Sequence, residues 1–429
     1  MKIKLKKKYK ILIRLVVVRR DYSTYGLLKT CLEALGCKVL IVSSNNFTIA
    51  LKLWRPDAVI VHTLTSGKIA NDILPSVKKF FLDVEGFRIQ NLSHAKFFLE
   101  QKSCMKYFSY FFFWGKRIVG EFQKFAPSLD RSKIKIIGNP KLDLARYLKT
   151  NLKKKNLKIK SVGIATRFHA LNNHRGRPLI FSIANNPDKY KYTDTQIKSF
   201  LALMDVMKAI IKETEFKISI RVHPFEAVQG YQDNLKRWFG QKNLHRFQID
   251  ESLDFSEWVI NQDVVITPTT TALSECYLLN KPVINIDKIA KVVEYNKSRD
   301  KVVGDWFNGA YLPSTVKELI KMLKKGKLSV KKCKAVDEML KNYCDWHNGD
   351  YAAKVSMDYI VKKLNESKIS KFRISFSYGI VKSIISIKDR ITNFKNPLLK
   401  NFNYSTFYHK SPLIYSKVKE QILNNLTNN

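Results

Sequence analysis

The sequence has few cysteines and no pattern that pairs them. Six of its 429 residues are cysteine, with no CxxC pair and no spacing from histidine that is typical of a zinc site. Such sparse cysteines are typical of free thiols in a reducing compartment. We therefore expect a cytoplasmic protein without a disulfide framework and without a metal site.

Long apolar runs are missing as well. No stretch reaches the roughly 18 uninterrupted apolar residues of a membrane-spanning helix. The apolar run 11–18 is interrupted by Arg14 and followed by Arg19 and Arg20 without a small-residue cleavage site, so a buried strand explains it better than a signal peptide. Any contact with a membrane is expected to be peripheral.

Acidic residues are scarce relative to basic ones. Asp and Glu number 36 against 77 Lys and Arg, a formal net charge of +41. A chain so basic is attracted to polyanions such as phosphorylated substrates, an anionic membrane face or nucleic acid. A general bias toward lysine at the surface is the alternative. No RRM, KH or helix-turn-helix signature is present, so nucleic acid is not the expected partner and a polyanion-binding protein is only a further alternative.

The apolar residues that are present form continuous runs of strand length, which alternate with helical stretches. Such runs are typical of a parallel sheet covered on both faces. A first series occupies 11–18, 39–43, 58–62, 80–84, 110–114 and 134–138, and a second occupies 161–166, 217–222, 247–250, 264–267 and 283–287, on either side of the lysine-rich linker 139–160. Two series predict an α/β protein of two doubly wound, Rossmann-like domains that face each other across a cleft.

The predicted domains are 1–150, 151–365 with a closing helical stretch, and a basic tail, 366–429. The tail contains 11 Lys and Arg against 3 Asp and Glu, with aromatic residues between them. Within it, apolar residues of 372–392 fall near helical spacing. A basic amphipathic segment of this kind binds anionic membrane surfaces, and packing on the body of the protein or self-association is the alternative.

Polar residues gather at the C-terminal ends of two predicted strands. Asp83 and Glu85 follow one strand and precede a glycine, which places a carboxylate for general-base chemistry, with two solvated acids in a turn as the alternative. Pro224 ends another strand and presents the imidazole of His223. With Arg221 nearby, this second cluster is a candidate for phosphate recognition, and a purely structural histidine is the alternative.

A third cluster follows the strand 264–267. Thr269, Thr270 and Thr271 lead into a helix, where free backbone N–H groups and hydroxyls form an anion site, with ordinary capping as the alternative. The loop after the first strand of the second domain adds Arg167 and Asn173, which face the donor phosphates or the acceptor unless the loop is merely polar.

The order of these clusters, carboxylate–Gly, then His-Pro, then a threonine-rich turn, resembles bacterial sialyltransferases and related GT-B glycosyltransferases that use CMP-activated acidic sugars. The stretches FWGK at 113–116, GNPKLD at 138–143 and TPTTTALSECYLLNKPVINID at 267–287 are similar to a broad group of surface-carbohydrate biosynthesis proteins. The resemblance spans roughly 11–358 and does not cover the tail.

The resemblance implies an inverting, metal-independent glycosyltransferase that moves a nonulosonate-type or Kdo-type sugar from a CMP-sugar to a saccharide acceptor, without a further cofactor. Such acceptors are commonly lipid-linked, which fits a peripheral position on the inner membrane face. A UDP-sugar-dependent GT-B transferase and a nucleotide-sugar 2-epimerase remain alternatives.

The resemblance also assigns roles to individual residues. Glu85 or Asp83 matches the base; the chain reads Asp-Val-Glu-Gly, which leaves the choice open, and we prefer Glu85 because it adjoins the glycine. His223 matches the histidine that holds the donor phosphate, and Thr269 to Thr271 match the phosphate-cradling turn. Glu275, about one turn into the following helix, would reach the ribose hydroxyls.

Overall fold

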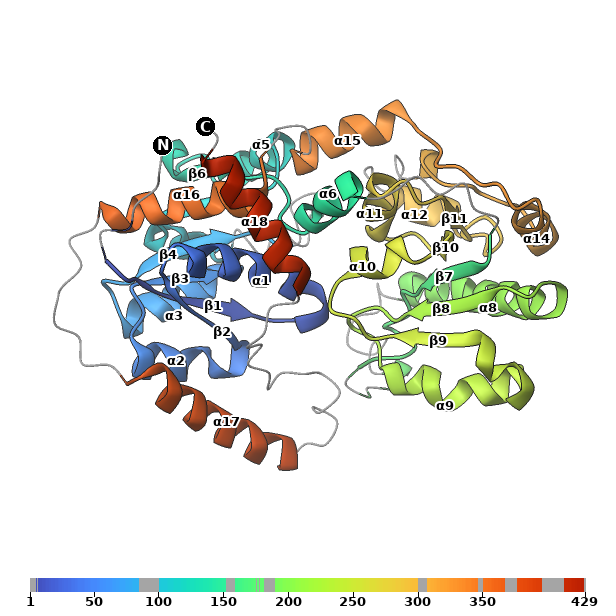
Figure 1. The fold of residues 1–429 in the computed structure, drawn as a ribbon, viewed down its shortest axis with the longest axis horizontal. Coiled ribbons are helices and arrows are strands. Elements are labelled where there is room, and N and C mark those ends of the chain that lie inside the picture. The colour runs from blue at the N-terminus through green and yellow to red at the C-terminus, as the bar shows by residue number, and fades with distance from the viewer. Residues whose placement is uncertain are drawn as a thin grey trace. The chain divides into compact units, whose positions relative to one another are not determined.

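The computed structural model describes residues 5, 7–84, 100–151, 159–174, 176, 178–180, 190–299, 307–345, 350–366, 376–395 and 413–427. The chain divides into two compact units, shown in Figure 1. The first contains Met1–Leu144 together with Leu340–Asn429, and the second contains Ala145–Met339. Each unit is built on one parallel β-sheet, which confirms the predicted pair of doubly wound α/β domains.

The first unit contains a six-stranded sheet in the order β2-β1-β3-β4-β5-β6, with every neighbouring pair parallel. Strands β1 to β5 are buried nearly throughout because their Ile, Val and Phe side chains are covered on both faces, whereas the edge strand β6 is half-buried. The strands are β1 (Lys10–Leu15), β2 (Lys38–Ser43), β3 (Ala58–Val61), β4 (Lys78–Leu82), β5 (Tyr110–Phe113) and β6 (Ile134–Ile136).

Helices from both ends of the chain complete the first unit. They are α1 (Val18–Ala34), α2 (Phe47–Trp54), α3 (Leu64–Ile73), α5 (Lys116–Phe125), α16 (Ala352–Asn365), α17 (Tyr378–Lys395) and α18 (Leu413–Thr427). The chain crosses between the units within α6 (Leu142–Asn151) and α15 (Lys334–Cys344). Short 3₁₀ helices of the first unit occupy Ser44–Asn46, Lys102–Tyr107 and Arg131–Lys133, and one of the second unit occupies Gln241–Arg246.

Helix α16 belongs to the first unit, which differs from the predicted bounds of the second domain. The buried carboxylate of Asp143 accepts hydrogen bonds from the backbone N–H groups of Ala352 (2.9 Å) and Ala353 (2.8 Å) at the start of this helix. The Tyr9 hydroxyl donates to the carbonyl of Leu364 at its end (3.2 Å). The physical reason is that α16 finds its capping group and its packing surface on the N-terminal part of the chain.

Both described helices of the tail pack on the first unit, where α17 lies against α2 and α18 against α1 (Figure 1). The Tyr378 and Trp54 rings lie 6.3 Å apart, and Tyr415 of α18 is fully buried. A Cβ atom at Gly26 would lie 2.8 Å from the Tyr415 ring, so only glycine permits this approach. Packing on the body, the alternative weighed for the tail, therefore holds for these helices. Among the described residues, no helix combines the length and the apolar character that crossing a membrane requires.

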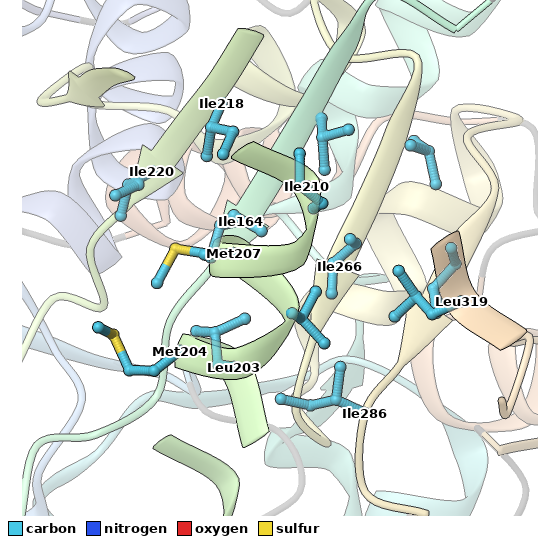
Figure 2. Packing of buried hydrophobic residues seen from close by; sticks show 14 of the residues in the cluster. Ile164, Leu203, Met204, Met207, Ile210, Ile218, Ile220, Ile266, Ile286 and Leu319 are labelled. Atoms are coloured by element: carbon cyan, nitrogen blue, oxygen red, sulfur yellow. The ribbon is translucent and has the colours of Figure 1, made fainter. Parts of the chain in front are cut away.

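The second unit contains a five-stranded parallel sheet in the order β11-β10-β7-β8-β9. Its strands are β7 (Ser161–Ala165), β8 (Lys217–Arg221), β9 (Phe247–Asp250), β10 (Val264–Thr267) and β11 (Val283–Asn285). Its helices are α8 (Tyr190–Glu213), α9 (Val228–Phe239), α10 (Phe255–Ile260), α11 (Ala272–Leu278), α12 (Val293–Arg299) and α14 (Val316–Lys324). Figure 2 shows Met207 and Ile210 of α8 in the same buried cluster as Ile218 of β8.

The strand order reverses at one place in each sheet. In the first unit β1 lies between β2 and β3, and in the second β7 lies between β8 and β10. At such a switch point the loops after the two neighbouring strands diverge to opposite faces, which leaves a crevice at the C-terminal ends of the strands. The predicted phosphate-binding clusters all follow strands β7, β8 and β10 of the second sheet.

Candidate functional site

The loops that follow β7 and β8 are joined by one buried carboxylate, Glu226. It accepts hydrogen bonds from the Thr166 hydroxyl (3.1 Å), the Phe168 backbone N–H (2.6 Å) and the Tyr231 hydroxyl (2.7 Å). Burial, and then the negative charge of Glu226, raises the pKa of Tyr231 well above its ordinary value, which keeps this hydroxyl a donor. Glu226 therefore fixes the two loops relative to each other.

His223 is held in place by the same network. Its backbone N–H donates to the Thr166 hydroxyl oxygen (3.0 Å), and its ring Nδ1 accepts from the Phe225 backbone N–H (3.2 Å). Because Nδ1 is the acceptor, the proton of the neutral ring is on Nε2. This tautomer makes Nε2 a hydrogen-bond donor, which is the kind of group that binds phosphate. The adjacent Pro224 is half-buried.

Two further histidines gather around Phe225. The His169 ring stacks on the His223 ring with centroids 5.6 Å apart, and its Nε2 is 3.2 Å from the Tyr192 hydroxyl. The buried His174 is 2.9 Å from the Phe225 carbonyl through Nδ1, which therefore donates. The loops after β7 and β8 thus form an aromatic, histidine-rich surface beside the switch point.

Across the switch point, the turn after β10 is organised by a second buried carboxylate, Asp287. It accepts from the Thr269 backbone N–H (3.1 Å), the Thr269 hydroxyl and the Asn296 amide (2.6 Å). Burial raises the pKa of Asp287, although hydrogen bonds from Thr269 and Asn296 and the charge of Arg167 act in the opposite direction. Arg167 also donates from its guanidinium to the Thr269 carbonyl, which links the loops after β7 and β10.

The other threonines of this turn differ from Thr269 in exposure. Thr270 is half-buried, and its hydroxyl oxygen is 3.4 Å from the Ala272 backbone N–H. Thr271 is exposed and its side chain makes no capping hydrogen bond to α11, which is only seven residues long. Glu275 accepts a hydrogen bond from the Ser256 hydroxyl (3.2 Å). Thr271 is therefore the exposed residue among the three threonines of the turn.

Two other predicted ligands are engaged within the protein. The buried guanidinium of Arg221 donates to the Asp250 carboxylate and to the Ser252 hydroxyl (2.8 Å), which ties β8 to the end of β9. The Asn173 side chain is 3.4 Å from the His169 carbonyl, and its backbone forms an isolated bridge with Glu226. In the structure both residues position the loops around His223.

The first unit contains the predicted general bases at the end of β4. Asp83 is buried, its backbone N–H donates to Phe112 (3.1 Å), and its carbonyl accepts from the Trp114 indole (2.7 Å). Glu85 lies outside the described residues.

The structure adds a charged group at the first switch point that the sequence interpretation did not assign. The fully buried Asp21 is paired with the guanidinium of Arg20, which lowers its pKa against the opposing effect of burial. Tyr25 lies close enough for Asp21 and Asp83 to raise its pKa, after burial, which is the largest cause. The charges that follow the apolar run after 18 were the signal for this group, since the first turn of the helix after a parallel strand lies at the ligand edge of the sheet.

The cysteines are all free thiols, and each except Cys333 is buried. Among the described residues, no group of three or more His, Cys, Asp or Glu side chains is arranged as a metal site.

Two compact doubly wound units with ligand-edge loops of this kind define a GT-B type fold. Comparison of the sequence with protein-family models finds no match, and comparison with curated proteins finds none either.

Solved structures of similar fold include the Staphylococcus aureus MnaA–UDP co-structure, with a TM-score of 0.50, 14% identity, and coverage of 86% of this chain and 100% of that chain. A putative UDP-N-acetylglucosamine 2-epimerase from Listeria monocytogenes has a TM-score of 0.51 at 14% identity, with the same coverage. A variant of the wall teichoic acid polymerase TagF has a TM-score of 0.51 at 13% identity and covers 84% of this chain and 90% of that chain. Likeness at this identity confirms the fold and assigns no activity.

Proposed function

We propose that this chain is an inverting glycosyltransferase of the GT-B type, whose second unit binds the nucleotide of a sugar donor at the switch point between β7 and β10. The observation that carries the proposal is that the loops after β7, β8 and β10, which bear Arg167, His223 and the threonines, are joined by hydrogen bonds at this crevice. Arg167 is anchored across it by the Thr269 carbonyl, and His223 is held with its N–H at Nε2. A cation and an N–H donor on loops of the same edge as the exposed Thr271 favour a phosphate group as the ligand.

The proposed reaction is attack of an acceptor hydroxyl on the anomeric carbon of the donor sugar. A carboxylate of the first unit, Glu85 in preference to Asp83, takes the proton of that hydroxyl as the new C–O bond forms. The bond between the anomeric carbon and the donor phosphate breaks, and the nucleotide leaves with the electron pair. His223 and Arg167 stabilise the negative charge on the departing phosphate, so the proposal needs no metal ion.

We further propose that the donor is a CMP-linked acidic sugar and that the acceptor is a saccharide of a surface polysaccharide or glycan, carried on a lipid. The support is the order of the carboxylate, His-Pro and threonine clusters in the sequence. We place the enzyme in the cytoplasm, peripherally on the inner face of the membrane.

A second candidate is a nucleotide-sugar 2-epimerase. It is favoured by the similar folds of the UDP-bound MnaA and of the Listeria protein named as an epimerase. The two candidates differ in their need for an acceptor, because an epimerase converts its nucleotide sugar alone whereas a transferase releases nucleotide in proportion to acceptor.

The test is to incubate the full chain with CMP-linked acidic sugars, or separately with UDP-N-acetylhexosamines, each with and without a mixture of oligosaccharide acceptors. Chromatography then separates free nucleotide, isomerised donor and extended acceptor. We expect nucleotide release that requires both a CMP-sugar and an acceptor. Isomerised or free sugar formed without acceptor would establish the epimerase instead.

A further inference from the structure

One face of α17 exposes a row of large apolar side chains. Phe376, just before the helix, is 49% exposed, and Ile380, Ile384 and Ile387 are 48%, 38% and 59% exposed. Their spacing of four, four and three residues places them on a single stripe of the helix, which we call the α17 stripe.

The opposite face of α17 already accounts for its packing. Val381 and Ile385 are fully buried against the first unit, and the Lys388 ammonium donates to the Asn45 carbonyl (2.7 Å). The helix is therefore apolar on two sides, of which the fold covers one. Single exposed apolar residues are ordinary, but an apolar row on one helix face indicates a partner.

Charge decides which partner fits. Over Tyr378–Lys395 the sequence of α17 contains one acidic residue, Asp389, against the basic residues Lys382, Lys388, Arg390 and Lys395. Lys52 and Arg55, at the end of the helix on which α17 packs, are exposed as well. A second copy of this chain would bring the same positive charge against itself, whereas an anionic bilayer complements it.

The exposed apolar residues of α8 provide a contrast. Ile197 and Leu201 are exposed on that helix, but they lie among charges of both signs, because Lys198 pairs with Asp194 (2.7 Å) and Asp205 is exposed. Neutralised charge at the same place gives an anionic surface less attraction.

We propose that α17 docks the protein onto anionic phospholipid. The helix lies in the plane of the membrane interface, with the α17 stripe among the acyl chains and exposed basic residues such as Lys52 and Arg55 at the headgroup phosphates. This deepens the peripheral position proposed above by naming the surface and the lipid, and it does not depend on the chemistry of the second unit.

The test is co-sedimentation of the full chain with phosphatidylcholine vesicles that contain phosphatidylglycerol or lack it. The stripe variant carries Ile380→Ser, Ile384→Ser and Ile387→Ser. Because these side chains are exposed, we expect its melting temperature to match that of the wild type. Loss of the three apolar side chains should weaken partition onto phosphatidylglycerol vesicles by about tenfold or more, and high salt should weaken the wild type.

The matched control replaces exposed apolar residues elsewhere, with Ile69→Ser, Ile197→Ser and Leu201→Ser, and should bind vesicles as the wild type does. Equal pelleting of the stripe variant and the wild type overturns the proposal. So does a wild-type dimer in solution that the stripe variant abolishes without any vesicle binding, because a second copy is then the partner. Nucleotide affinity is measured on the same preparations. A wild type that binds nucleotide but no vesicles refutes the docking alone, and a wild type that binds vesicles but no nucleotide refutes the proposed function alone.

Discussion

Replacement of Glu226 by alanine should disconnect the loop after β7 from the loop after β8. The side chain accepts three hydrogen bonds, from Thr166, Phe168 and Tyr231. Hydrogen bonds to a charged group contribute about 1.5–3 kcal/mol each, so the gross loss is roughly 5–9 kcal/mol. Removal of a buried carboxylate regains its desolvation penalty of several kcal/mol. We therefore expect a net loss of about 2–4 kcal/mol in the free energy of unfolding, or roughly 5–10 °C in melting temperature.

The assay combines thermal unfolding with nucleotide titration at a temperature where the variants stay folded. Glu226→Ala should weaken nucleotide binding by about tenfold, because Thr166 no longer fixes the backbone of His223. Tyr231→Phe removes one of the three hydrogen bonds and should cost about 1.5–3 kcal/mol with little change in binding. Glu251→Ala, at an exposed carboxylate, is the control and should change neither quantity. A Glu226→Ala protein with wild-type stability and wild-type affinity would refute this view of the loops.

Three other results follow from the structure. Glu85→Gln should lower turnover by roughly two to four orders of magnitude with unchanged nucleotide affinity; loss of turnover in Asp83→Asn instead would move the base by two residues. Burial raises the pKa of Asp358 to about 6, so its charge destabilises the fold above that pH and not below about pH 4. Asp358→Asn should therefore raise the free energy of unfolding near pH 7 by about 1 kcal/mol, a figure discounted for solvent access, and should leave it unchanged at pH 4. The control, Asp205→Asn at an exposed carboxylate, should leave the free energy of unfolding unchanged at both pH values. An equal gain for Asp358→Asn at pH 7 and pH 4 would contradict this reasoning. Finally, Cys333 should react first with a thiol reagent, and the five buried cysteines only on unfolding; several fast thiols in the native protein would contradict their burial.

The sheets could be predicted from the sequence because burial on both faces leaves a local signal. The run 58–62 became β3 (Ala58–Val61), and the run 264–267 became β10 with the same bounds. The strand predicted over 11–18 was too long, since β1 ends at Leu15 and α1 begins at Val18. Apolar residues at the start of a buried helix give the same local pattern as the end of a buried strand.

The partners of the polar residues could not be predicted, because they are distant in sequence. Arg221 was assigned to phosphate, but its guanidinium meets Asp250 and Ser252, about 30 residues away. The Thr269 hydroxyl meets Asp287 from the neighbouring strand end. Residue type and position after a strand locate the ligand edge of the sheet, whereas tertiary contacts decide which of its side chains remain available to a ligand.

The tail shows the same limit at a larger scale. Its basic, aromatic composition suggested a surface segment, yet Tyr415 is buried on α1 against Gly26, nearly 400 residues earlier in the chain. Periodicity identified apolar residues in 372–392 without saying which of them the protein itself covers. That distinction, between Val381 inside and Ile387 outside, comes only from the packing of α17.

The most direct test of the central claim is calorimetric titration of the full chain with CMP, UMP and GMP, on the wild type and on His223→Ala. We expect CMP to bind most tightly, and His223→Ala to weaken its affinity by about tenfold through loss of the Nε2 donor. His245→Ala, at an exposed histidine outside the loops, should bind as the wild type does. Tighter binding of UMP would mean that the donor carries uridine instead of cytidine, and the proposed site would stay the same. Binding of no nucleotide by the wild type, or equal affinity in His223→Ala, would contradict a nucleotide site at the switch point of the second unit.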